Sequence, residues 1–154
     1  MKFKKIGKIH LIIIVSIALT IISAGMSKIP STIDGVIKRP DGKFLITQRV
    51  MTKAWAPGWW EVSGGAAQAG EESVEAVRRE VFEETGIDVT NADGGYVFTY
   101  KRENPGEGDN YFVDVYRFTL DIDDSDVNFQ EAEIDGYMSV SYTHLRAHET
   151  RGNL

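Results

Sequence analysis

The sequence contains no cysteine. This absence excludes disulfide bonds, thiolate metal sites and cysteine nucleophiles, and it leaves the redox compartment open. An excess of positive charge is also missing, since the 154 residues carry a formal net charge of −6. A general nucleic-acid or anionic-membrane surface needs grouped lysines and arginines, so the composition argues against both partners. Small phosphorylated ligands stay open, because a bound divalent cation can invert the local charge.

The longest apolar run, residues 11–24, falls short of the ~20 residues that a comfortable transmembrane helix needs. Four lysines lie in the first ten residues, and small residues close the run. A basic start, a short apolar stretch and small residues are typical of a signal peptide or signal anchor. We therefore predict such a segment over residues 1–31, with membrane attachment through residues 9–26 and an anchored or exported domain. A buried β-rich segment or a mis-assigned start codon is the alternative, and the domain is then cytoplasmic.

The rest of the chain has an ordinary globular composition, with 42% hydrophobic and 26% charged residues, and one-domain length. Short runs bounded by turn residues predict β-strands. They cover residues 32–38, 43–50, 59–63, 95–102, 111–120 and 135–141. The turn residues 39–42 predict a hairpin between the first two strands. Strands on both sides of a single helix predict an α/β class domain with a mixed sheet.

That helix is predicted within residues 64–87, which read GGAAQAGEESVEAVRREVFEETGI. Gly86 is its expected C-terminal cap. At about 100° per residue, Val74, Val77 and Val81 fall on one narrow stripe, which predicts the face that packs on the core.

Glu80, Glu83 and Glu84 share an arc that borders the valine stripe. Their carboxylates are therefore expected at the rim of the buried face, partly desolvated and repelling one another. Arg79 is placed to pair with Glu83 and with Glu75, yet one arginine cannot neutralise so many acids. The arrangement predicts a site for Mg²⁺ or Mn²⁺, which prefer oxygen ligands. A salt-bridged surface helix is the alternative.

Two glycines precede the helix, Gly64 and Gly65. Because they lack a Cβ, the backbone can approach the glutamates closely and offer a carbonyl oxygen to the same metal. We include Gly65 among the predicted metal ligands.

The same stretch resembles the Nudix box, Gly-x5-Glu-x7-Arg-Glu-U-x-Glu-Glu-x-Gly-U, in which U is aliphatic. The matching positions, without a gap, are Gly65, Glu71, Arg79, Glu80, Val81, Glu83, Glu84, Gly86 and Ile87. Seven fixed positions agree by chance in only on the order of 10⁻⁸ of windows. The resemblance to Nudix hydrolases extends over about residues 32–140, and Ser63 departs from it where many members have proline.

The resemblance implies the Nudix α/β/α sandwich with a mixed sheet. It also implies Mg²⁺-dependent hydrolysis of the diphosphate in a nucleoside diphosphate linked to another moiety. Glu80, Glu83 and Glu84 are then metal ligands, and Arg79 orients them. Oxidised nucleotides, dinucleotide polyphosphates, nucleotide sugars and capped RNA all stay open as substrates.

Further site residues are predicted outside the helix. Arg49, at the end of the second strand, is predicted to hold a phosphate in a forked contact. In the Nudix family an acid on the loop before the last strand often completes the site, and Glu131 and Glu133 are the candidates here. We choose Glu131 as the general base, with Glu83 on the helix as the alternative. Six aromatic residues are either core or a base-stacking platform. They are Trp55, Trp59, Trp60, Tyr96, Phe98 and Tyr100.

Residues 141–154, SYTHLRAHETRGNL, resemble a translated adapter read-through. We predict a non-native tail there and the loss of the family's closing helix. Two other functions stay open. A catalytically silent nucleotide-binding Nudix module would be expected to lose box glutamates, and none is lost here. A protein like isopentenyl-diphosphate isomerase would need a cysteine that this chain lacks.

Overall fold

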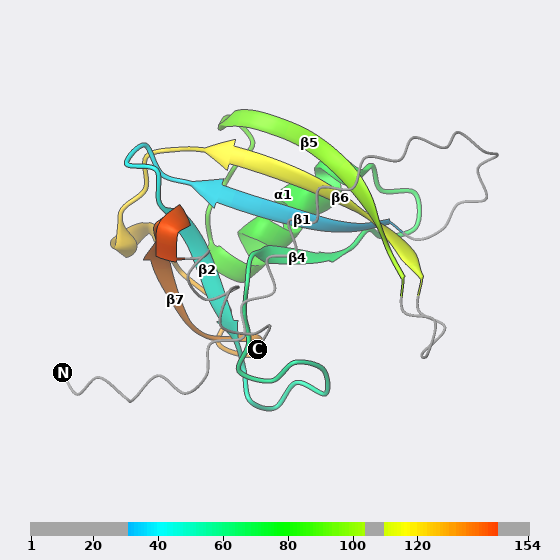
Figure 1. Ribbon diagram of the computed structural model, residues 1–154, viewed down its shortest axis with the longest axis horizontal. Helices are drawn as coiled ribbons and strands as arrows, with labels where there is room; N and C mark the ends of the chain where they lie inside the picture. Colours follow the sequence, from blue (N-terminus) through cyan, green and yellow to red (C-terminus); the bar gives the residue numbers. More distant parts are fainter. Residues whose placement is uncertain (1–30, 104–109, 145–154) are drawn as a thin grey trace.

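The computed structural model describes residues 31–103 and 110–144 (Figure 1). Its strands are β1 (Ser31–Lys38), β2 (Phe44–Arg49), β3 (Trp60–Glu61), β4 (Ser63–Ala66), β5 (Asp93–Arg102), β6 (Tyr111–Thr119) and β7 (Ile134–Val140). The main helix is α1 (Ser73–Thr85), and a short 3-10 helix, η1 (Asp124–Asp126), precedes β7. All the predicted strands are confirmed, with the predicted strand 59–63 divided between β3 and β4.

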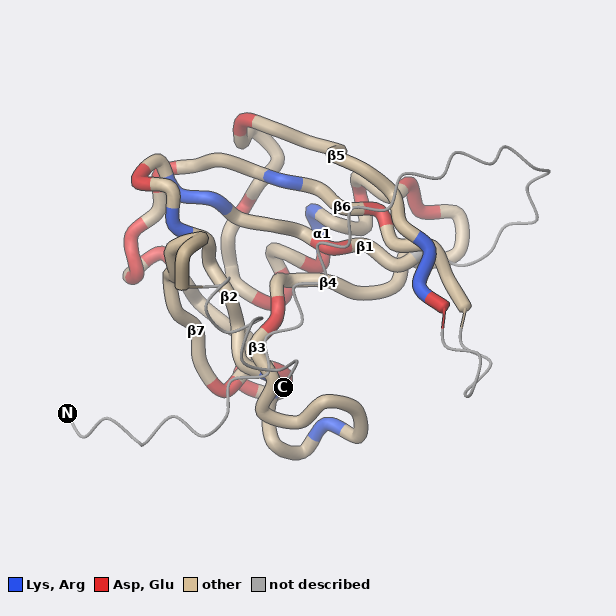
Figure 2. The backbone as a smooth tube through the Cα atoms, in the orientation of Figure 1, with Lys and Arg blue, Asp and Glu red and all other residues tan. Residues whose placement is uncertain are grey.

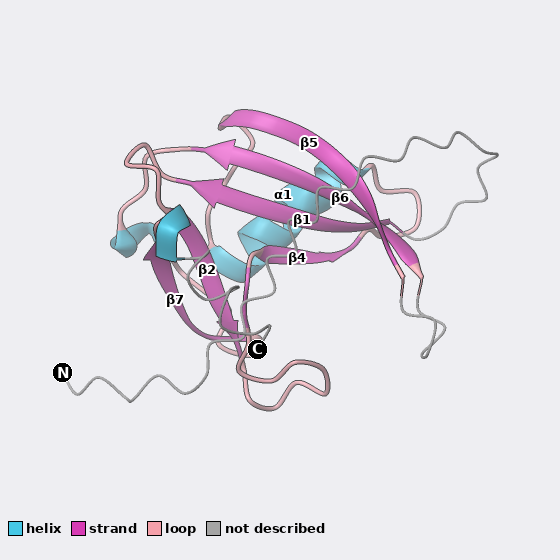
Figure 3. Ribbon diagram, viewed as in Figure 1, coloured by secondary structure: helices cyan, strands magenta, loops and turns pink. Residues whose placement is uncertain are grey.

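The strands form one mixed sheet with β1 at its centre (Figure 3). β6 runs parallel to β1 along its whole length, and β5 pairs antiparallel with β6. On its other side, β1 pairs with β4 through Gly35↔Ser63 and with the start of β2 through Ile37↔Leu45. β1 and β2 therefore diverge, and the chain from β3 to β4 fills the split between them. This wedge brings the residues that precede α1 into the middle of the sheet.

α1 covers one face of the sheet (Figure 1). Val77 and Val81 are completely buried in the core with Ile33 and Ile37 of β1, as the helical stripe predicts, while Val74 is only partly buried. The two valines lie so close to β1 that a Cβ at Gly35 would be 2.6 Å from Val81 Cγ2. The glycine in β1 therefore lets the helix pack directly on the sheet.

Both ends of α1 have local causes. The Glu75 carboxylate accepts the Glu72 N–H at 3.3 Å and so caps the first turn. Gly86 takes a left-handed conformation, with φ at 73°, and donates its N–H to the Phe82 carbonyl at 2.8 Å. The predicted cap at Gly86 is confirmed. The helix starts later than residue 64, because β4 and a turn from Gln68 to Glu71 come first.

The α/β class with a mixed sheet is confirmed, with one main helix as its cover. In the described ranges this helix is the only helical layer on the sheet; residues 142–144 are helical, and residues 145–154 lie outside those ranges. Among the described helices, none combines the length and the hydrophobicity that spanning a membrane requires. The predicted signal segment falls on residues 1–30, which the structure does not describe, and on Ser31, the first residue of β1.

Candidate active site

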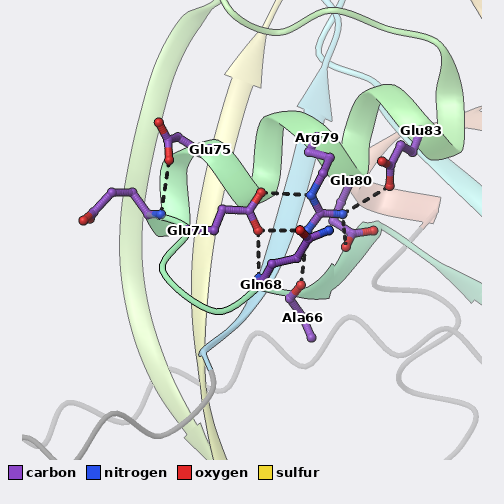
Figure 4. A network of polar contacts seen from close by, with 8 residues as sticks. Ala66, Gln68, Glu71, Glu75, Arg79, Glu80 and Glu83 are labelled. Carbon is purple, nitrogen blue, oxygen red and sulfur yellow. Dashed lines mark hydrogen bonds and ion pairs between the residues drawn. The ribbon is translucent and has the colours of Figure 1, made fainter.

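Arg79 of α1 lies at the centre of a network of carboxylates from the helix and from the turn that precedes it (Figure 4). Its Nε and Nη2 donate to the two oxygens of Glu71 at 2.9 and 3.0 Å, which forms a forked pair. Its Nη1 donates to Glu80 at 2.8 Å and to Glu83 at 3.1 Å. Hydrogen bonding to Arg79 lowers the pKa of Glu71, so this carboxyl stays ionised and holds the arginine in place. Arg79 in turn orients the other two glutamates.

The predicted pairing of Arg79 with Glu83 is confirmed, whereas the pairing with Glu75 is not found. Glu75 caps the helix instead, and its place is taken by Glu71, which the turn before the helix brings to Arg79. Acidic positions recur along α1 (Figure 2). Arg79 forms ion pairs with those nearest to it, Glu80 and Glu83, and with Glu71 before the helix.

Glu80 lies directly against the backbone of β4. A Cβ at Gly65 would be 2.5 Å from Glu80 Oε1 and 2.7 Å from Glu80 Oε2. Only glycine at this position lets the carboxylate reach the backbone, as the Gly64 and Gly65 pair predicts. The Glu80 carboxylate of α1 therefore lies directly beside the backbone of β4.

Glu84 is the most buried of the three box glutamates, with 7% of its surface exposed, whereas the Glu83 side chain is 52% exposed. Burial, with the charges of Glu61 and Glu80, raises the pKa of Glu84 to about 8, against the opposing effect of hydrogen bonds from Ser63 and the Gly64 N–H. Its Oε2 has no hydrogen-bond partner among the described residues. A buried carboxyl with an unsatisfied oxygen beside other acids is costly, and a cation would relieve it.

Glu61 belongs to this site, although the sequence did not single it out. It pairs with Thr47 across β2 and β3, and its carboxylate accepts Arg49 Nη1 at 2.8 Å. Burial raises the pKa of Glu61, and Arg49 lowers it. The available signal was alternation, because residues 61, 63 and 65 of WEVSGG fall on one side of an extended chain. That side faces Glu84 and Glu80.

Arg49 reaches the site through Glu61. Its described contacts are all with groups of the protein, and the phosphate contact predicted for it is not among them. Besides Glu61, it donates Nε to the Trp55 carbonyl at 3.2 Å, and its guanidinium lies 5.4 Å from the Trp55 ring. Its Nη2 takes part in none of the hydrogen bonds found among the described residues. The predicted contact with a phosphate stays a prediction.

The loop before β7 docks on the end of α1. Asn128 donates its N–H to the Thr85 carbonyl at 2.8 Å, and Gln130 donates to the Glu84 carbonyl at 3.2 Å. On this loop Glu133 binds Lys53 at 2.9 Å, and its charge raises the pKa of Glu61. Glu131 is exposed, and its side chain makes no hydrogen bond or ion pair within the described ranges. The described contacts therefore connect Glu133 with Glu61, whereas the role predicted for Glu131 stays a prediction.

The residues fit a divalent cation, although the described side chains do not form a ready cluster of three ligands. The fit rests on the unpartnered oxygen of Glu84, the approach of Glu80 to Gly65, and a donor set made of oxygen alone. Arg79 Nη1 bridges the carboxylates of Glu80 and Glu83 and so holds these two oxygen ligands next to each other.

The sequence pattern of the NUDIX domain matches residues 28–153. This chain belongs to the NUDIX family. An uncharacterized Nudix hydrolase of Listeria monocytogenes is 34% identical over 112 residues, which are 72% of this chain and 63% of that protein. The CTP pyrophosphohydrolase of Escherichia coli is 38% identical over 79 residues, 51% of this chain and 56% of that protein. The chain spans less than two thirds of the length of these relatives.

Solved structures agree with the NUDIX fold. The crystal structure of a Deinococcus radiodurans protein matches with a TM-score of 0.66 at 25% identity, and the match covers 80% of this chain and 74% of that one. The predicted family and fold are therefore confirmed. NUDIX proteins typically use a divalent metal, which agrees with the oxygen-rich site on α1.

Gly65→Ala is expected to weaken metal binding about 10-fold or more while changing the stability of this NUDIX domain little. The added Cβ displaces the Glu80 carboxylate, which is the far end of a flexible side chain and can move at low cost. Mn²⁺ titration and thermal unfolding measure the two effects. Gly136→Ala on β7 is the control, because nothing lies within 4 Å of its added Cβ. Unchanged Mn²⁺ affinity in Gly65→Ala would show that the close contact between Glu80 and the backbone at Gly65 does not contribute to metal binding.

Proposed function

We propose that this chain is a divalent-cation-dependent pyrophosphohydrolase of nucleoside phosphates. The observation that carries the proposal is Glu84, a buried carboxyl with an unpartnered oxygen beside Glu80 and Glu61. A carboxyl placed in this way lowers the stability of the metal-free protein. Such a cost is expected at a functional site, where strongly perturbed carboxyls cluster.

Mg²⁺, or Mn²⁺ in its place, would be held by Glu80, Glu84 and the backbone carbonyl of Gly65, with Glu83 as an exposed further ligand. A cation there supplies positive charge against the diphosphate oxygens of a substrate. Arg79 keeps Glu80 and Glu83 oriented through its forked pair with Glu71. Its role is to position these groups.

The proposed substrate is a small nucleotide whose phosphoanhydride bond is cleaved by water. The E. coli relative carries the name CTP pyrophosphohydrolase, which supports a nucleoside triphosphate. Water then attacks the α-phosphorus, and the bond between this phosphorus and the bridging oxygen breaks. Pyrophosphate leaves with that oxygen, and a nucleoside monophosphate remains. Arg49 would bind a phosphate through its remaining N–H donors, with Glu61 and Trp55 fixing its orientation.

A general base takes the proton of the attacking water. The sequence favoured Glu131, but the described contacts favour Glu133, whose charge reaches Glu61. Lys53 fixes the Glu133 carboxylate at 2.9 Å, and Val50 binds the Glu133 carbonyl through its N–H at 3.0 Å. We infer that Glu133 is the better placed of the two loop acids.

Glu133→Gln is expected to lower kcat by about 10²–10⁴ with KM little changed, because an amide cannot accept the proton. Glu131→Gln is the matched control and is expected to be nearly silent. The pH profile of kcat should lose its acidic limb in the Glu133 variant alone. The reverse result, with Glu131→Gln severe and Glu133→Gln silent, would restore Glu131 as the base. Loss of the acidic limb only in Glu83→Gln would place the base on α1.

The proposed activity is tested with a panel of nucleoside triphosphates, dinucleotide polyphosphates and nucleotide sugars. Each is incubated with the full chain and Mg²⁺, and the released phosphate and pyrophosphate are measured separately. We expect pyrophosphate from at least one triphosphate, and none when the metal is chelated. Tight nucleotide binding without turnover would instead identify a silent binding module.

A further inference from the structure

Asp34 lies on the face of the sheet opposite α1. Its neighbours on β1, Ile33 and Gly35, face the helix, so the alternation of a strand turns Asp34 to the other face. There the Tyr100 hydroxyl donates to Asp34 Oδ2 at 3.3 Å. Gly64 pairs with Asp34 across the strands, and its missing side chain leaves room for the carboxylate, since a Cβ at Gly64 would be 2.9 Å from Asp34 Oδ1.

The Asp34 carboxylate has capacity for further hydrogen bonds. It is only partly exposed, and within residues 31–103 and 110–144 no lysine, arginine or histidine forms an ion pair with it. An ionised carboxylate has about four acceptor positions, and Tyr100 fills one of them. Burial, with the charge of Glu61, raises the pKa of Asp34 to about 6, against the opposing effects of the Tyr100 hydrogen bond and the charge of Arg102. A donor from a ligand would offset this cost.

Trp55 connects this carboxylate with the candidate active site. The residue is 47% exposed, and the centre of its ring lies 5.4 Å from the guanidinium carbon of Arg49 and 5.2 Å from that of Arg102. Arg49 belongs to the active site, whereas the charge of Arg102 acts on Asp34. Glu61 likewise raises the pKa of both Asp34 and Glu84. The two groups of side chains are therefore neighbours, joined by an exposed aromatic surface.

We propose that Asp34 is a specificity-determining residue. Its carboxylate accepts a hydrogen bond from the exocyclic amino group of a nucleobase, while Trp55 stacks on the base. The inference rests on the proposed function, because the phosphates of the same nucleotide would lie at Arg49 and at the cation proposed beside Glu84. A carboxylate attracts an amino group and repels a carbonyl oxygen. Cytosine carries an amino group where uracil has a carbonyl, and adenine carries one where hypoxanthine has a carbonyl. Cytidine or adenosine nucleotides are therefore bound in preference to uridine or inosine nucleotides.

The test is equilibrium binding of two matched pairs, CMP against UMP and AMP against IMP, measured by quenching of tryptophan fluorescence without metal. We expect the amino member to bind about 10-fold or more tightly in at least one pair. Asp34→Asn should reduce the preference to within about threefold, because its amide presents a donor as well as an acceptor. Tyr100→Phe, which removes only the hydroxyl that holds Asp34, should weaken the preference and gives a second variant if Asp34→Asn does not fold.

The control is Asp114→Asn, an acid on β6 that pairs with Ile33 and therefore lies on the α1 face; it should keep the full preference. Equal affinities within both pairs, no binding of any of the four nucleotides at millimolar concentration, or a preference that survives in both Asp34→Asn and Tyr100→Phe overturns the role of Asp34. Binding is measured without turnover, so failure of the proposed function is recognised separately. A chain that binds the amino nucleotides but hydrolyses none contradicts the activity and leaves the specificity intact.

Discussion

Glu84→Gln is expected to lose most hydrolytic activity and yet to be more stable than the unchanged protein in metal-free buffer at pH 8. The activity falls because the amide removes a negative ligand from the proposed cation site. The stability rises because the buried carboxyl no longer has to ionise beside Glu61 and Glu80, whose charges oppose it. A loss of activity together with a gain of stability is expected where a functional group is held at a cost to the fold, so the result identifies Glu84 as such a group.

The pH dependence follows from the raised pKa of Glu84, about 8 in the folded chain against 4.5 ordinarily. The folded state holds this proton more tightly than the unfolded state, so the free energy of unfolding falls as pH rises from about 4.5 to about 8. The full penalty is present above that range and is on the order of 3–5 kcal/mol. In Glu84→Gln the curve of stability against pH should be shallower. It is not flat, because burial also raises the pKa of Asp34 to about 6.

Urea unfolding at several pH values between 5 and 9, with the metal chelated, measures the effect. Glu83→Gln is the matched control for stability, since it makes the same chemical change one residue earlier at an exposed position. Its pH curve should follow that of the unchanged protein. Parallel curves of stability against pH for Glu84→Gln and the unchanged protein would show that the pKa of Glu84 is not raised by folding.

Arg79→Ala is expected to cost about 2–4 kcal/mol of stability, because it leaves partly buried carboxylates without their shared cation. Activity should fall at least 10²-fold, since Glu80 and Glu83 lose the group that orients them. Arg79→Lys should recover part of the stability and little of the activity, because an ammonium cannot reproduce the forked pair with Glu71.

Thermal unfolding and initial rates measure these changes. Arg78→Ala is the control, as the adjacent arginine forms no ion pair in the described part of the chain. It should leave the rate unchanged. A large loss in Arg78→Ala, or full activity in Arg79→Lys, would contradict the positioning role of the guanidinium fork.

Much of this architecture is visible in the sequence because its causes are local. Alternation identifies the strands, the helical stripe identifies Val77 and Val81, and the need for a left-handed residue identifies Gly86 as the cap. The family follows from the spacing of glutamates and glycines within one segment. The boundaries of the predicted signal segment, the domain at 32–140 and the tail at 141–154 remain predictions.

What the sequence could not give depends on distant segments. Glu83 and Glu84 are adjacent and alike in sequence, and the packing of α1 on β4 and β1 buries one and leaves the other exposed. The partner of Arg79 was misjudged because helical spacing favours Glu75, whereas a turn brings Glu71 to it. Glu61 joins the site through strand pairing, for which the alternation of residues 61, 63 and 65 was the available signal. Glu133 joins it through the docking of its loop, for which the sequence offers no periodic signal.

The central claim is that the carboxylates of α1 hold a divalent cation against β4, with Glu84 as the buried ligand. Mn²⁺ binding at pH 8, followed by electron paramagnetic resonance on the unchanged protein, Glu84→Gln and Gly136→Ala, tests it most directly. The account predicts binding in the unchanged protein, the same affinity in Gly136→Ala, and a loss of about 10- to 100-fold or more in Glu84→Gln. Equal Mn²⁺ affinity in all three proteins, or no binding in any of them, would contradict it.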